Sequence, residues 1–115
     1  MKRMILLLTA AAMLAASPAQ ADKIDDLLKS RKTMVAAVAI LMQSPPNCTV
    51  DKKRLDPYDI ARFIARHGYN PNDSFMADVK TQMKKNDDFG MTREELEMFC
   101  GMGIVYSAKV REANR

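Results

Sequence analysis

The stretch TREELEMFCGMGIVYSA, residues 92–108, decides the fold because it predicts a long helix that is apolar on more than one side. Thr92 with Glu95 three residues later is a capping box, which marks a helix N-terminus. A helix that is apolar all round is usually buried among other helices. We expect this helix to give way to a polar tail from Lys109 to Arg115.

Two apolar stripes run along this predicted helix. The stripe expected to face the domain's own core consists of Leu96, Phe99, Gly103, Tyr106 and Val110. The second stripe consists of Met98, Met102 and Val105. If other helices cover both stripes, the helix is simply central; if the second stripe is exposed, its adaptable methionines form a candidate partner surface. We expect such a surface to bind a protein partner or a second copy of the chain.

Gly101 and Gly103 interrupt the same helix. Each is unfavourable by roughly 1 kcal/mol relative to alanine in a helix interior, so a compensating reason is expected. One reason is the close approach of another backbone at a position without a side chain. The other is a kink or helix end at residues 100–103 that shapes a binding groove.

Cys48 and Cys100 are the only cysteines of the chain. Their spacing matches neither a Cys-x-x-Cys redox motif nor a haem-attachment motif. In an exported protein such a pair is expected to form a disulfide, which would stabilise the fold by about 4 kcal/mol in the chain-entropy model. Two free thiols or an intermolecular bridge are the alternatives.

The first 21 residues have the three parts of a cleaved signal peptide. Met1 to Arg3 is a short cationic start, Met4 to Ala16 is an apolar run broken by Thr9, and Ala19-Gln20-Ala21 fits a signal-peptidase site. The run is too short to span a bilayer, which needs about 20 apolar residues. We therefore predict a mature chain starting at Asp22, a single helical domain over residues 22–115, and a location in the periplasm or outside the cell.

Three further helices are predicted before residue 92. The first is a block from Asp22 to Met42, apolar on all sides from Met34 onward and ended by Ser44-Pro45-Pro46. The second starts at Asp56-Pro57 and stops at Gly68, and the third starts at Asn70-Pro71 and ends near Lys84-Lys85. No stretch alternates as a strand would. The predicted fold is an all-α bundle of about four helices stapled by one disulfide.

Charge and motifs argue against several functions. Without Lys2 and Arg3 the basic residues number 16 against 14 acidic ones, so the net charge falls from +4 to +2 and nucleic acid is not an expected partner. No nucleophile-elbow, phosphate-loop or zinc-protease motif occurs. The neighbouring acids Asp25-Asp26 and Asp87-Asp88 point to different helix faces, so neither pair makes an acid/base dyad. We expect no enzyme activity and no stable membrane insertion after cleavage.

Metal and cofactor sites are also not expected. Met98 and Met102 lie one helical turn apart and thioethers bind Cu(I), yet the methionines follow core-like spacing. His67 would be a haem ligand only with a methionine partner, and on an apolar helix face it is more simply a packed or capping residue. Residues 86–97 fail as a calcium loop because Met91 stands where glycine is required.

In outline, a signal peptide followed by a small helical domain with one disulfide resembles the acid-stress periplasmic chaperones, and equally exported immunity or inhibitor proteins. No motif of either group maps onto named positions, so no functional residue is carried over. The first functional hypothesis is a non-enzymatic protein-binding module: an inhibitor, immunity protein, adaptor or accessory subunit. The alternative is a periplasmic stress or acid-stress holdase, and the third is an uncharacterised enzyme.

Overall fold

The structure is a computed structural model that describes the backbone of residues 18–115 and the side chains of residues 23–115. In this range it is all-helical, which confirms the predicted fold class. Its elements are α2 (Pro18–Leu27), α3 (Arg31–Gln43), the short 3-10 helix η1 (Pro46–Cys48), α4 (Pro57–Arg66), α5 (Asp73–Asp88) and α6 (Arg93–Ala113). Most of the signal peptide predicted for residues 1–21 lies outside the described residues.

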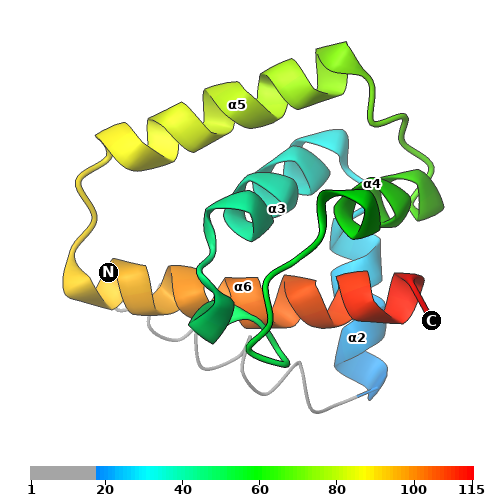
Figure 1. The fold of residues 1–115 in the computed structure, drawn as a ribbon, viewed down its shortest axis with the longest axis horizontal. Helices are drawn as coiled ribbons and strands as arrows, with labels where there is room; N and C mark the ends of the chain where they lie inside the picture. Colours follow the sequence, from blue (N-terminus) through cyan, green and yellow to red (C-terminus); the bar gives the residue numbers. More distant parts are fainter. Residues whose placement is uncertain (1–17) are drawn as a thin grey trace.

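Helix α3 occupies the centre of the molecule. It lies between the two longest helices, α5 and α6, which run along opposite edges in Figure 1, and it packs against both. Helix α4 packs on α6 and α3, and η1 packs on α6. The apolar run predicted for residues 34–42 explains this position, since Met34, Val35 and residues 37–41 are buried.

The predicted first helix is in fact two helices. The chain leaves α2 after Leu27, and Ser30 starts α3 by accepting a hydrogen bond from the Thr33 amide. The Tyr69 hydroxyl bonds to the carbonyl of Lys29 at 2.5 Å and lies 3.1 Å from that of Leu28. Serine favours helix starts, and the distant Tyr69 satisfies carbonyls that the end of α2 leaves free. In the full chain α2 begins at Pro18, upstream of the start expected at Asp22.

The other helix limits follow the predicted capping residues closely. Asp56 caps α4 and Gly68, at φ +84°, follows its end, as predicted. The predicted start of α5 is wrong by two residues, because Asn72 is the residue that caps the helix, through the Phe75 amide. Thr92 and Glu95 form the predicted capping box of α6.

The polar tail predicted from Lys109 is wrong. Helix α6 continues to Ala113, and both Lys109 and Val110 are buried within it. Charged side chains in this last stretch are held by carboxylates from other elements, which gives the helix a reason to continue. Helix α6 is continuous through residues 100–103, so the alternative of a helix end at those residues is wrong.

The disulfide joins η1 to the middle of α6. Cys48 and Cys100, 52 residues apart, are bonded with their Cα atoms 4.8 Å apart. Gly103 lies against the same place: a Cβ atom there would come within 2.7 Å of the Cys48 carbonyl oxygen and 2.5 Å of Ser44 Oγ. The close approach predicted for Gly103 is therefore confirmed, with the backbone of η1 as its neighbour.

Candidate functional site

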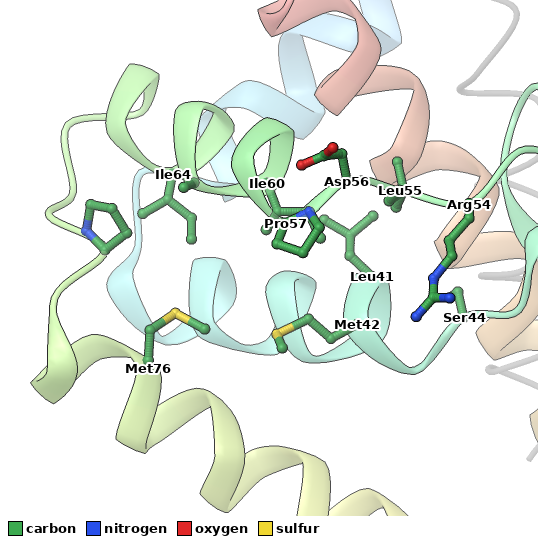
Figure 2. A pocket seen from close by; sticks show the side chains of 12 residues that line it. Leu41, Met42, Ser44, Arg54, Leu55, Asp56, Pro57, Ile60, Ile64 and Met76 are labelled. Atoms are coloured by element: carbon green, nitrogen blue, oxygen red, sulfur yellow. The ribbon is translucent and has the colours of Figure 1, made fainter.

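An apolar groove of about 640 Å³ opens between the end of α3, helix α4 with the loop before it, and the start of α5. We call it the α3–α4–α5 groove and define it by its lining side chains. These are Leu41, Met42, Leu55, Pro57, Ile60, Ala61, Ile64, Pro71 and Met76, with Ser44, Arg54 and Asp56 at one end. In Figure 2 the thioethers of Met42 and Met76 face the isoleucines of α4 across the opening. Met42 is 44% exposed, so the groove presents apolar side chains to solvent.

The polar groups of the groove are gathered at one end and are mostly engaged. Asp56 accepts a hydrogen bond from the Tyr58 amide at 2.7 Å, and Ser44 Oγ donates to the Ile40 carbonyl at 2.6 Å. Arg54 is exposed, and none of the ion pairs found within residues 23–115 includes its guanidinium. This arrangement suits binding better than catalysis, because the serine and the aspartate already serve the helix ends.

A second cavity of about 530 Å³ lies at the junction of α3, α5 and α6, beside the disulfide. Its polar wall is a side-chain network: Gln43 Nε2 donates to Asp87 at 3.0 Å, and Asn86 donates back to Gln43 at 2.9 Å. Leu96 and Phe99 line its other side. Because these polar groups bond one another, the network explains how α3 and α5 are held in register.

Asp25 on α2 is the centre of an ionic cluster that sequence patterns did not reveal. Its carboxylate lies 3.0 Å from Lys109 Nζ and 3.5 Å from His67 Nε2. Lys109 is 7% exposed and has Glu112 as a second partner at 3.6 Å. His67 Nδ1 lies 3.0 Å from the Phe63 carbonyl, so that nitrogen is the donor and Nε2 faces Asp25. Three helices, α2, α4 and α6, therefore meet at one carboxylate.

The neighbouring acid, Asp26, takes no part in this cluster. It pairs with Lys29 at 3.0 Å on the exposed side of α2, and this hydrogen bond raises the pKa of Lys29. The prediction that Asp25 and Asp26 point to different faces is therefore confirmed.

Arg111 ties the end of α6 to the loop before α4. Its Nη2 donates to Asp51 Oδ1 at 3.2 Å, Nε lies 2.8 Å from Asp51 Oδ2, and Nη1 lies 3.5 Å from Asp59 Oδ2. Nη2 also reaches the carbonyl of Arg54 at 3.4 Å. The hydrogen bond from Arg111 is the main reason that the pKa of Asp51 is lowered. The backbone beside the groove is thus anchored to α6.

The predicted second stripe of α6 is not an exposed patch in this structure. Met98 and Val105 are only 6% and 5% exposed, and Met102 is half-buried. Val105 belongs to the apolar core. The predicted core stripe is also only partly right, because Val110 is buried and Leu96 is 56% exposed. Burial of both stripes along much of α6 agrees with a central helix.

Sequence reasoning missed the groove and Lys109 for different reasons. Met98, Met102, Val105 and Lys109 follow one another at spacings of four, three and four residues, so the stripe itself indicated a buried position at Lys109. The charge of Lys109 favours an exposed polar tail, and this is why the sequence predicts one there. The groove is made by side chains from three helices, and no local pattern predicts how these come together.

Candidate ligands do not gather into a metal site in the part of the chain that the structure describes. Within residues 18–115 no three histidine, cysteine, aspartate or glutamate side chains lie together as possible metal ligands. None of the helices in that range is long and apolar enough to cross a membrane. Comparison with protein-family models, with curated proteins and with solved structures gave no match.

Proposed function

We propose that this protein is an exported, non-enzymatic protein-binding module, and that the α3–α4–α5 groove is where it holds its partner. The class includes inhibitors, immunity proteins, adaptors and accessory subunits. The observation that supports it is the open apolar groove, in which Met42 stays exposed although the chain buries its other α3 residues from Val38 to Leu41. A contiguous apolar surface rimmed by polar residues is one of the features that mark protein interaction sites.

The side chains of the groove suit a protein partner. Methionine is flexible and polarisable, so Met42 and Met76 adapt their shape to an apolar segment that enters between α4 and α5. Leu41, Ile60 and Ile64 supply a rigid floor, because they are buried in the domain core. A firm floor with adaptable edges lets one surface accept side chains of several shapes.

Comparative crosslinking tests this proposal. Met42→Gln places a polar group in the groove at an exposed position, so the fold should survive while partner capture in the native envelope falls at least several-fold. Leu27→Gln is the matched control, since Leu27 is 53% exposed and lies on α2, outside the groove. A partner that the wild type and both variants capture equally would contradict the groove as the binding site.

Export is part of the same proposal. The disulfide of the structure is compatible with an oxidising compartment, where such bonds form and persist. The predicted signal peptide gives the direct test, because intact mass spectrometry of the exported protein should find Asp22 as the first residue. A soluble chain that retains residues 1–21 would contradict it.

The holdase alternative is favoured by one observation, the burial of Lys109 against Asp25. Lys109 is 7% exposed and depends on the carboxylates of Asp25 and Glu112 for its counter-charge, and strong acid removes carboxylate charge in general. A charged group that loses its partner while buried is strongly destabilising. Helix α2 would then leave the bundle and uncover its own buried side chains Ile24 and Leu28, while the disulfide, which does not depend on pH, still joins η1 to α6.

A pair of neighbouring variants tests the holdase. Asp25→Asn mimics the acid state at neutral pH, so it should bind an apolar dye such as anilinonaphthalene sulfonate at about pH 7, as the wild type should at about pH 3. Asp26→Asn is the control, because within residues 23–115 Asp26 pairs only with the exposed Lys29. Dye binding that is equal in the two variants, or absent from the wild type in acid, would rule the mechanism out.

A further inference from the structure

The α3–α4–α5 groove has two chemically different ends. One end, near Ile64 and Met76, is apolar. At the other end Figure 2 shows Arg54 reaching toward Ser44, while Asp56 lies between Ile60 and Leu55 in this view. Asp56 keeps its negative charge, and one of its carboxylate oxygens accepts the Tyr58 amide at the start of α4. The groove therefore offers a long apolar surface, lined in addition by one guanidinium and one carboxylate.

The backbone of Arg54 is held in place, whereas its side chain is exposed. Its carbonyl oxygen accepts from Arg111 Nη2 at 3.4 Å, and the next residue, Leu55, is buried. The backbone at this point is thus held from both sides, whereas the guanidinium is exposed. Guanidinium groups bind carboxylates in a planar, two-point geometry, so the natural complement of this end is an acidic side chain.

The walls of the groove favour a helical occupant. They are built from the side chains of helices, whose backbone groups already bond within each helix. An extended segment would find no sheet edge to pair with, and its own amides and carbonyls would lose hydrogen bonds on burial. A helix satisfies its backbone internally and presents side chains alone.

We infer that the groove binds an amphipathic helix of another protein, with an acidic side chain of that helix paired to Arg54. The inference rests on the proposed function and specifies the chemistry of the partner. The apolar face of the helix packs on Met42, Met76 and the isoleucines of α4. The carboxylate then sets which way the helix lies, since among the described residues that line the groove Arg54 is the only cation and it lies at one end.

Matched peptides and a charge reversal test this inference. The probes are fluorescent amphipathic helical peptides that share one apolar face and carry either Glu or Lys at the end residue. Binding is measured by fluorescence anisotropy, and the methyl signals of Met42 and Met76 are followed by NMR. The Glu peptide should bind about five-fold more tightly, as expected for one solvent-accessible ion pair, and Arg54→Glu should reverse the order. Lys52→Glu is the matched control, with the same charge change outside the groove.

The outcomes separate this inference from the proposed function. If neither peptide shifts the two methyl signals, the groove is not a protein-binding site and both proposals fail. If both peptides bind equally and Arg54→Glu changes nothing, the groove binds proteins but the acidic partner is wrong. If a proline in mid-peptide leaves binding unchanged, the helical occupant is wrong. Dimers of the chain that exclude both peptides would make a second copy the occupant.

Discussion

Helix α6 is held in two places by different physics. At its middle the contacts are covalent and close-packed: Cys100 is bonded to Cys48, Gly103 lies against the η1 backbone, and Ser107 Oγ accepts the Val50 amide at 2.8 Å. Near its end the contacts are ionic, through Lys109 and Arg111. We call the first set of contacts the seam and the second set the ionic end. The contacts of the seam do not depend on pH or salt, whereas those of the ionic end do. Changes in pH or salt therefore act on the end of α6 and leave its middle in place.

Of the changes considered for these two regions, removing the disulfide should have the largest effect on stability. Replacing both Cys48 and Cys100 with serine frees the unfolded chain from a long loop, which should lower the free energy of unfolding by about 4 kcal/mol. Urea denaturation followed by circular dichroism measures the loss. A change below about 1 kcal/mol would mean that packing alone holds the seam.

Gly103→Ala should break the same seam without touching the sulfurs. At an exposed position in a helix interior, replacing glycine with alanine would stabilise the protein by about 1 kcal/mol, because alanine is the better helix former. Here the new Cβ meets the Cys48 carbonyl, so we expect a loss of about 2 kcal/mol by chemical denaturation. Adding Ser44→Ala should recover only part of it, since the Cys48 carbonyl stays in place. A stabilised single variant would contradict the close packing.

Asp51→Asn tests the contact between Asp51 and Arg111 at the ionic end. Arg111 lowers the pKa of Asp51 in the folded protein. The contact therefore stabilises the fold at every pH above the usual pKa of an aspartate. This stabilisation is lost as the pH falls through the lowered pKa. The variant should therefore melt a few degrees below the wild type at neutral pH, and the difference should shrink in acid. Asp88→Asn, at the exposed end of α5, is the control. A gap that widens in acid would contradict the assignment.

The smallest effect is expected at Lys52, in the loop between the two regions. Lys52 has a φ of +58°, a left-handed conformation that costs a non-glycine residue roughly 1 kcal/mol. Lys52→Gly relieves that cost but gives the unfolded chain more freedom, so the net gain should stay below about 1 kcal/mol. Thermal denaturation at neutral pH measures it. A clear loss of stability would show that the lysine side chain holds the loop.

The helices could be predicted where a local device sets their limits. Asp56-Pro57, Gly68 and the pair Thr92 and Glu95 act within one or two turns, and each marks a limit of the structure. The break after Leu27 has one local signal, the capping residue Ser30, and is otherwise set from a distance. It depends on Tyr69, which is distant in sequence and bonds to the end of α2.

The candidate site was less predictable because it is a property of packing. The stripe of Met98, Met102 and Val105 was visible in the sequence, but whether a stripe is covered depends on the neighbours of α6 rather than on α6 itself. Charge misled the prediction at Lys109, which is buried because Asp25 arrives from another helix. Arg54 gave no sequence signal, since its role follows from the anchored loop around it.

The disulfide also determines what happens if the chain is cut. It closes a covalent ring over residues 48–100 that contains all of α4 and α5, while α2, α3 and the second half of α6 extend from it. The turn between α5 and α6 carries the 67% exposed Phe89 next to Gly90, and such turns are preferred sites of proteolysis. One cut there opens the ring but releases no fragment, because the sulfurs still join the two pieces. A nicked molecule would keep its intact size on a non-reducing gel and separate only when a thiol is added.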